Sequence, residues 1–442
     1  MNILILSNLD RGGAGTAAVR LLRNLNSDKY SSRLLVSMKT TPEKNVVGMS
    51  TGFAGTKSVA SVIGRKILHR LNSVLGIKES GNSDPRYCFF SSEKKTRIFT
   101  ASQVVKRLQF KPDVIVVLFI DMYLTFDVVR ELSERYRCPV VWYLMDMELL
   151  TGGCHYAWEC RRYEDQCGKC PALYSGNDKD QSYNQLVEKQ RWIHPMNFTA
   201  VAASQSLFAQ CLQSSLLKGK PIHKILLPVD PERFKPAVIK PKKSFGIQEH
   251  ERIIFIGASS LSEERKGMIF LLDALRRYNG MYAGQTDNLH LLIAGNAGHG
   301  FDLEVPFPYT HAGYLDNEDA LIRAYQAADV FVCPSIEDSG PMMINEALMC
   351  GTPTVAFNVG VAPDLVITGK TGFLAKKKDS SALAEGIHSV LSLNDTGYKR
   401  MSDECRAHGV SLCHPQIQYQ KFDAIFSNLG SHGTRGTSDY AK

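Results

Sequence analysis

Two carboxylates, Asp338 and Glu346, flank the start of a predicted helix and could bind the hydroxyl groups of one ligand. An apolar run at 330–333 predicts the end of a buried strand, and the polar loop that carries Asp338 follows it. Pro341 suits a first helical turn, because its missing N–H costs nothing there. A helix N-terminus offers unpaired N–H groups and a positive dipole end, which suit a phosphate or sugar oxygens. The alternative is an ordinary capped helix with a solvated Glu346.

The residues around these carboxylates, 334–355, read PSIEDSGPMMINEALMCGTPTV. This stretch resembles the E-x7-E signature of retaining glycosyltransferases of family 4, which have the GT-B fold. Asp338 stands where the family has Glu, and Glu337 is a nearby alternative for its role. The resemblance implies that Glu346 binds the ribose of a nucleotide and that Asp338 faces the donor sugar. It also assigns the turn between them to donor binding, through Ser339, Gly340, Pro341, Met342 and Met343.

A second group of candidates is the cationic loop that follows a predicted strand at 252–257. Lys266 and the glycine after it match a K-G element of the same family, in which an Arg and a Lys hold the donor diphosphate. Ala258 stands where the family has that Arg, so Arg265 is the substitute candidate. Cations here would stabilise the departing diphosphate; the alternative is a surface run of charge. The catalytic candidates are therefore four residues: Arg265, Lys266, Asp338 and Glu346.

Two turns complete the predicted donor site. The family seats the nucleotide base mostly on backbone, at a turn that corresponds to Tyr314 and Leu315. Near the start of the chain, a predicted strand at 1–9 leads into a glycine-rich turn and then a helix. Glycines let backbone N–H groups approach a ligand closely, although any such turn can need glycine for its shape alone. The resemblance places this turn near the donor phosphates and the acceptor, through Gly12, Gly13 and Gly15.

The segment after a predicted strand at 139–144 carries further polar candidates. Its Met145-Asp146-Met147 triplet and the TGGCHY motif at 151–156 resemble a subgroup of glycosyltransferases of bacterial surface-polysaccharide synthesis. The subgroup has His where this chain has Met145, so a role for that histidine is not expected here. Asp146 and His155 are instead the candidates to face the cleft between the domains.

Four cysteines in the loop 151–171 have a spacing that suits a metal: Cys154, Cys160, Cys167 and Cys170. Thiolates bind zinc tetrahedrally, and a C-x2-C pair supplies two ligands from one turn. A closed four-sulfur zinc would brace the loop and take no part in catalysis. Zinc is favoured over disulfides because no secretory signal accompanies the cysteines, and over free thiols because the compact loop and the C-x2-C pair suit a small structural site.

Length and composition fit a globular protein of two domains. The chain has 442 residues, of which 44% are hydrophobic and 22% charged. No apolar run approaches the ~20 residues of a membrane span, and the first ten residues lack the basic start of a signal peptide. The net charge of +8 could attract a diphosphate ligand or an anionic membrane, and no nucleic-acid motif is present. Residues 53–78 have the pattern of a basic amphipathic helix. Such a helix can lie on a membrane surface, and the alternative is an ordinary helix of the domain with a solvated basic face.

Buried strands that alternate with helical segments predict an α/β protein. With the resemblance, the expected fold is GT-B: two Rossmann-like domains facing across a cleft, with a C-terminal helix that crosses back to the first domain. The expected parts are an N-terminal acceptor-side domain at 1–232, a nucleotide-sugar-binding domain at 233–415, a return helix at 416–430 and a disordered tail at 431–442.

The expected function is that of a retaining glycosyltransferase of the hexosyltransferase type. It would move a sugar from a UDP- or GDP-sugar to a glycan or polyprenyl-diphosphate-linked acceptor in polysaccharide, O-antigen or capsule synthesis. No D-x-D motif appears in its family context, so we expect no cofactor in catalysis. The expected location is the cytoplasm, with peripheral association at the cytoplasmic face of the inner membrane. The alternatives are a non-catalytic scaffold and a nucleotide-sugar epimerase on the same fold.

Overall fold

The chain forms two compact units in the computed structural model, which describes residues 1–50, 83–90, 99–284, 286, 288–297, 304–340 and 342–431. Unit 1 comprises Met1–Ala202, Leu207–Ile225 and Tyr419–Lys442, and unit 2 comprises Ala203–Ser206 and Leu226–Gln418. The change of unit after Ile225 comes shortly before residue 232, where the sequence analysis ends the first domain. The amphipathic stretch 53–78 and residues 432–442 of the predicted tail lie outside the described residues.

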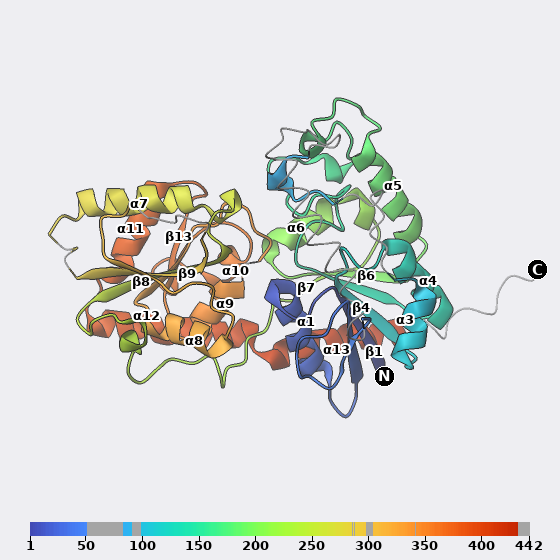
Figure 1. Ribbon diagram of the computed structural model, residues 1–442, viewed down its shortest axis with the longest axis horizontal. Coiled ribbons are helices and arrows are strands. Elements are labelled where there is room, and N and C mark those ends of the chain that lie inside the picture. Colours follow the sequence, from blue (N-terminus) through green and yellow to red (C-terminus); the bar gives the residue numbers. More distant parts are fainter. Residues whose placement is uncertain are drawn as a thin grey trace, which may run out of the picture. The chain divides into compact units, whose positions relative to one another are not determined.

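Unit 1 is built on a parallel sheet of seven strands, in the order β3-β2-β1-β4-β5-β6-β7 (Figure 1). The strands are β1 Asn2–Ser7, β2 Ser31–Val36, β3 Val46–Gly48, β4 Val114–Phe119, β5 Val140–Leu144, β6 Phe198–Ala202 and β7 Ile222–Lys224. The helices that belong mainly to this unit are α1 Gly12–Leu25, α3 Ala101–Leu108, α4 Phe126–Tyr136, α5 Gln181–Ile193, α6 Gln205–Gln213 and α13 Pro415–Ser431.

Unit 2 is built on a parallel sheet of six strands, in the order β10-β9-β8-β11-β12-β13 (Figure 1). The strands are β8 Arg252–Ser260, β9 Leu289–Asn296, β10 Tyr309–His311, β11 Val330–Cys333, β12 Thr354–Phe357 and β13 Gly372–Ala375. The helices are α7 Met268–Met281, α8 Glu318–Ala327, α9 Met342–Met349, α10 Ala362–Leu365, α11 Ser380–Leu391 and α12 Asp395–Cys413. The two sheets confirm the predicted arrangement of two parallel-sheet α/β units.

The central strands are apolar throughout because helices cover both faces of a parallel sheet. Residues 3–6 of β1, 115–117 of β4 and 253–255 of β8 are fully buried. The helices supply the matching apolar stripes, such as Leu21 and Leu22 of α1. Continuous apolar runs in the sequence therefore identify these strands without the alternation that a half-exposed strand would show.

Each sheet has one point where the winding of the chain changes direction. In unit 1, β1 lies between β2 and β4; in unit 2, β8 lies between β9 and β11. The loops that follow such a pair of strands run to opposite sides of the sheet and leave a crevice at its carboxyl edge, where open α/β sheets bind ligands. The loops after β1 and β4, and those after β8 and β11, are therefore the places where this fold positions a site.

The last helix, α13, packs within unit 1 although the chain reaches it from unit 2. Phe422 is fully buried, and its ring centre lies 5.4 Å from that of Tyr143 in β5 and 5.6 Å from that of Phe426. Asp423 accepts hydrogen bonds from Lys29 and from the hydroxyl of Tyr30. The end of the chain is thus part of the core of the first unit.

We predict that Phe422→Ala destabilises unit 1 by about 3–5 kcal/mol, because removing a buried ring costs its transfer free energy and leaves a cavity. Urea unfolding of the full chain, followed by circular dichroism, measures the change. Gln420→Ala, at an exposed position of the same helix, is the control and should unfold like the wild type. An unchanged transition in Phe422→Ala would show that α13 does not contribute to this core.

Candidate functional site

In unit 2, the winding of the chain changes direction at β8, and we call this position at the carboxyl edge of the sheet its switch point. Three of the predicted site residues meet there. Lys266 Nζ lies 2.5 Å and Arg265 Nη1 3.2 Å from Asp338 Oδ2. The cations come from the loop after β8, and the carboxylate comes from the loop after β11, the neighbouring strand. The three side chains are only 10–14% exposed, so water screens this contact weakly.

The two loops also approach each other through their backbones. The N–H of Ile336 donates to the Arg265 carbonyl at 2.8 Å. Gly267 has a φ of +69°, and a Cβ at this position would lie 1.9 Å from the Pro334 carbonyl oxygen. Glycine is therefore required by both the left-handed conformation and the close approach. The K-G element is a packing requirement that holds Lys266 beside the loop of Asp338.

The charge of Asp338 depends on its cationic neighbours. Burial by itself would raise the pKa of this carboxyl, but Lys266 and then Arg265 outweigh burial and lower the pKa below its usual range. The N–H of Gly340 also donates to Asp338 Oδ1, at 3.3 Å. Asp338 is thus held as a carboxylate whose partners are the two cations assigned to the diphosphate.

Glu346 lies within α9 and is 2% exposed, which rules out the solvated position that an ordinary helix would give it. The hydroxyl of Tyr325 donates to Glu346 Oε2 at 3.0 Å. Tyr325 is itself fixed, since its ring packs on Phe255 and Phe331 at centre distances of 5.3 and 5.6 Å. A buried and oriented carboxylate of this kind can accept hydrogen bonds from ligand hydroxyls with little loss of entropy.

The other donor-site candidates of unit 2 are spread along its carboxyl edge. The Ser339 carbonyl accepts a hydrogen bond from the hydroxyl of Ser204. Met343 packs against Gly257 of β8, where a Cβ would lie 2.1 Å from the Met343 methyl carbon. Met342 is half-buried at the start of α9, and Pro341 lies outside the described residues. Tyr314 is exposed, and Leu315 lines a groove of about 770 Å³ together with Phe245 and Arg323.

The glycine-rich turn of unit 1 follows β1, and its glycines differ in their surroundings. Gly12 has a φ of +72°, and among the residues that the structure describes no atom lies within 4 Å of a Cβ placed at Gly12 or Gly13. Gly15 is buried, and a Cβ there would lie 2.7 Å from the carbonyl carbon of Asp10. Gly15 therefore has a packing reason to be glycine, whereas the described residues give no such reason for Gly12 and Gly13.

A charged row lies at the carboxyl ends of β4 and β5 in unit 1. His155 Nδ1 is 3.0 Å from Asp146 Oδ2, and His155 Nε2 is 3.6 Å from Asp121 Oδ2. Burial opposes the charged form of His155, but the two aspartates outweigh burial and raise the pKa of His155 well above its usual value. The two carboxylates therefore favour the charged form of His155, which lies between them. The sequence analysis selected Asp146 and His155 but not Asp121.

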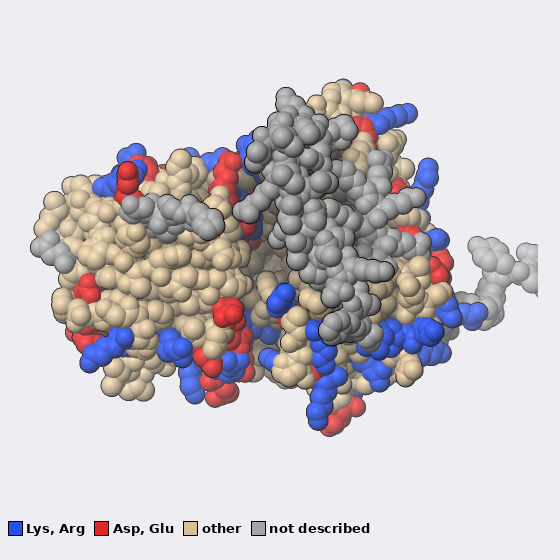
Figure 2. Space-filling model, viewed as in Figure 1, with Lys and Arg blue, Asp and Glu red and all other residues tan. Residues whose placement is uncertain are grey.

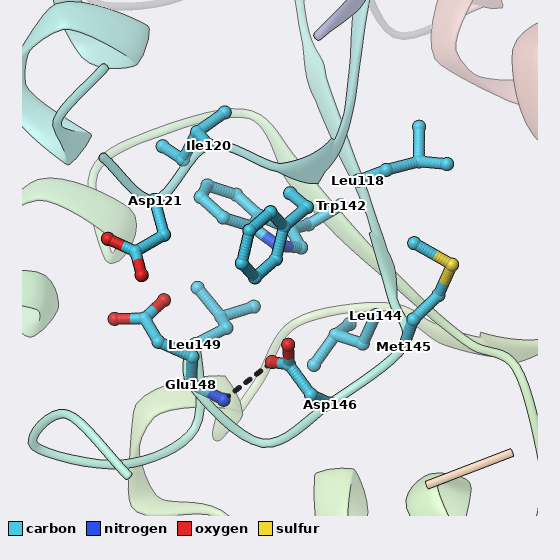
Figure 3. A pocket seen from close by; sticks show the side chains of 10 residues that line it. Leu118, Ile120, Asp121, Trp142, Leu144, Met145, Asp146, Glu148 and Leu149 are labelled. Atoms are coloured by element: carbon cyan, nitrogen blue, oxygen red, sulfur yellow. Dashed lines mark hydrogen bonds between the residues drawn. The ribbon is translucent and has the colours of Figure 1, made fainter. Parts of the chain in front are cut away.

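Asp121 and Asp146, but not His155, line a small cavity that leaves about 10 Å³ for a water-sized sphere (Figure 3). Figure 3 shows the carboxylates of Asp121 and Glu148 pointing toward each other, while Asp146 accepts from the Glu148 N–H at 2.9 Å. Glu148 Oε1 accepts from Lys189 Nζ of α5 at 2.8 Å, and this pair is almost fully buried. The apolar wall of the cavity includes Trp142.

The four cysteines only partly gather. Cys154 and Cys170 are buried and hydrogen-bond to each other, a contact that outweighs burial and lowers the pKa of Cys170 to about 7. Cys160 and Cys167 are close enough to influence Cys154 electrostatically. Yet among the described residues, which include all four cysteines, no three His, Cys, Asp or Glu side chains are placed to hold a metal ion. Zinc therefore stays a prediction from the spacing of the cysteines.

The sequence analysis did not select four residues that the structure places at these sites: Asp121, Glu148, Lys189 and Tyr325. Asp121 alone had a usable signal. It follows the end of the apolar strand β4 by the same offset at which Asp146 follows β5. The partners of Glu148 and Tyr325 come from separate parts of the sequence, so no local pattern indicates them.

Parts of the chain are similar in sequence to known glycosyltransferases. Residues 250–393 match the family model described as Glycosyl transferases group 1. An uncharacterized glycosyltransferase of Methanocaldococcus jannaschii is 24% identical over 257 residues, which cover 54% of this chain and 60% of that protein. A D-inositol 3-phosphate glycosyltransferase of a Mycobacterium species is 38% identical over 88 residues, or 20% of each chain. The chain thus matches less than two thirds of the length of these relatives.

Solved structures resemble nearly the whole chain. Sucrose-phosphate synthase of Thermosynechococcus elongatus has a TM-score of 0.66 at 16% identity and covers 98% of this chain and 100% of its own. HepE of Anabaena, in complex with UDP and glucose, has a TM-score of 0.63 at 16% identity. The alignment covers 97% of this chain and 99% of the HepE chain. Together with the two parallel-sheet units, this likeness shows that the chain has the GT-B fold.

We predict that the contribution of His155 to stability declines as the pH rises. The pKa of His155 is raised in the folded protein, so its ion contacts stabilise fully below the ordinary histidine pKa of about 6.5 and are lost as the pH rises through the raised value. His155→Gln should therefore lower the urea midpoint most near pH 6 and least at alkaline pH. The exposed His194, changed to Gln, is the control. An equal deficit at every pH would contradict a charged His155.

Proposed function

We propose that the protein is a retaining glycosyltransferase whose unit 2 binds a nucleotide-diphosphate sugar and whose unit 1 binds the acceptor. The observation that carries the proposal is the contact of Lys266 and Arg265 with Asp338 at the switch point of unit 2. Cations at such a crevice can hold a diphosphate and stabilise its charge as the bond to the sugar breaks. This contact lies within the segment 250–393 that matches the group 1 family.

The nucleotide of the donor is proposed to be uridine diphosphate. HepE, which shares the fold, has been solved with UDP and with UDP-glucose. Glu346 supports a ribose contact, because it is buried at the carboxyl edge and has a carboxylate oriented by Tyr325. A guanosine diphosphate donor remains the second candidate. The sugar and its acceptor are proposed only as classes: a hexose, and a glycan or a lipid-linked saccharide.

Association with an anionic membrane surface is part of the proposal for a lipid-linked acceptor. The net charge is +8, and Figure 2 shows Lys and Arg side chains gathered along one edge of unit 1, over α1 and α3. Such an edge can be attracted to anionic lipids. Within the ranges that the structure describes, no helix is both long and apolar enough to span a bilayer.

The non-catalytic scaffold and the epimerase make different predictions from the transferase. A scaffold would bind a nucleotide sugar without releasing the nucleotide. An epimerase would interconvert donor sugars or release free sugar without an acceptor. The paired cations at Asp338 favour a transferase over a scaffold, since a site that only binds has no need to stabilise a leaving diphosphate.

The first test is calorimetric binding of UDP and GDP to the wild-type protein and to Glu346→Gln. We expect UDP to bind, and the variant to bind it about 5- to 150-fold more weakly, because a charged hydrogen bond to ribose is worth about 1–3 kcal/mol. Gln is close to Glu in size and can still accept from Tyr325. Tyr325→Phe, which keeps the carboxylate, should weaken binding less.

Two outcomes would count against the proposal. A wild-type protein that binds neither nucleotide contradicts nucleotide-sugar binding altogether. Equal UDP affinity in the wild type and Glu346→Gln removes only the assignment of Glu346 to the ribose.

Zinc binding by the cysteine loop also stays a proposal, which rests on the spacing of its four cysteines. We expect about one zinc per chain by elemental analysis of protein purified without chelator, and less than half of that in Cys154→Ser. Cys211→Ser, a buried cysteine outside the loop, is the control. A wild-type protein without zinc, whose cysteines all react with a thiol reagent after unfolding, would show that they are free thiols.

A further inference from the structure

Asp121 occupies a position in unit 1 that corresponds to the position of Asp338 in unit 2. Each follows the strand that lies beside the first strand of its sheet: β4 beside β1, and β11 beside β8. The glycine-rich turn, which carries Gly12 and Gly13, follows β1 on the other side of the same switch point. Asp121 therefore lies where an open α/β sheet binds its ligand.

One oxygen of Asp121 lacks a hydrogen-bond donor. Oδ2 faces His155, but Oδ1 is buried and accepts no hydrogen bond from any residue that the structure describes. A buried carboxylate oxygen without a donor is unfavourable by about 1–3 kcal/mol or more. The cavity beside it has room for an oxygen atom with its proton, and for little else. A hydroxyl group or a water molecule matches this place in both size and polarity.

The charges around the cavity favour a neutral donor of hydrogen bonds over an anion. Asp121, Asp146 and Glu148 line the cavity with three carboxylates, and their ion-pair partners His155 and Lys189, which do not line it, supply two cations. One negative charge is left over, which disfavours a phosphate or a carboxylate. The side chains of Asp121, Asp146 and His155 are still 15%, 21% and 12% exposed, so part of the row is in contact with solvent, although Oδ1 of Asp121 itself is buried.

We propose that Asp121 binds a hydroxyl group of the acceptor, and that His155 positions Asp121 for this contact. The inference rests on the proposed function and gives its acceptor a chemical class: a polyhydroxyl compound that presents an uncharged hydroxyl to unit 1. His155 Nε2 lies 3.6 Å from Oδ2, an ionic contact that holds this oxygen and leaves Oδ1 to accept from the ligand. Asp146, on the other ring nitrogen, fixes the imidazole between the two strands.

The test uses water in place of the unknown acceptor, because water is the smallest hydroxyl group that can receive the sugar. In this hydrolysis the bond between the sugar and the diphosphate breaks, the water oxygen joins the sugar, and one proton is released. UDP release is measured with UDP-glucose, UDP-galactose and UDP-N-acetylglucosamine. Asp121→Asn should hydrolyse the preferred donor at least about 10-fold more slowly than the wild type, with a UDP affinity within about twofold of the wild-type value.

Two further variants separate positioning from folding. His155→Gln should slow hydrolysis in the same direction as Asp121→Asn and raise the KM for an acceptor glycoside more than it lowers kcat. Asp165→Asn removes an exposed charge from the same unit and should leave hydrolysis unchanged. The melting temperature of each variant shows whether a loss of activity comes from unfolding.

Each outcome decides the inference. Wild-type hydrolysis in Asp121→Asn overturns it, and so does a loss of UDP binding in that variant, which would assign Asp121 to the donor or to folding. The wild type could bind UDP but hydrolyse no UDP-sugar. In that case the readout is not the hydrolysis rate but glycoside binding, measured by saturation-transfer NMR with UDP and methyl glycosides of glucose, galactose and mannose. A glycoside signal that Asp121→Asn abolishes supports the inference, and no signal overturns it. A wild type that binds neither UDP nor GDP overturns the proposed function instead.

Discussion

All the charged sites described above depend on one constraint of the parallel sheet: every strand ends at the same edge. Residues that follow two neighbouring strands meet there, however far apart they are in the sequence. Lys266 and Asp338 meet because β8 and β11 are neighbours, and Asp121 and Asp146 meet because β4 and β5 are neighbours. The helices and the apolar core keep the strands in this order, and the order decides which loops can share a ligand.

The two units use this edge with opposite electrostatics. In unit 2, two cations surround one buried carboxylate, and Lys266 and Arg265 lower the pKa of Asp338 although burial raises it. A diphosphate that binds these cations competes with Asp338 for them. Its binding free energy therefore depends on how much more stable the cations are beside the diphosphate than beside Asp338 alone. In unit 1, carboxylates surround one imidazolium. Phosphate recognition suits the first arrangement, and hydroxyl recognition suits the second.

The loop that carries the cysteines is tied to the charged row of unit 1. His155 follows Cys154 directly, and its N–H donates to the Tyr87 carbonyl at 3.1 Å. Tyr87 belongs to the same small apolar cluster as Cys154 and Cys170. Lys189 adds a second tie, because it donates to the carbonyl of Thr151 as well as to Glu148. Whatever the cysteines bind, their packing contributes to the position of His155.

The sequence by itself determined the fold class, since its apolar runs are long enough to identify buried parallel strands, and the helices between them are amphipathic. It also selected Lys266, Arg265 and Asp338, because a family signature spans each of their loops. Asp121 had a signal in its offset from the end of β4 but was not selected, and Tyr325 could not be selected, because its importance lies in a contact with a residue far away in the chain. The cysteine spacing favoured zinc, but spacing does not determine where four sulfur atoms point, and the structure pairs two of them. Strand order, burial and ionic partners are properties of the folded chain, and only the tertiary structure decided them.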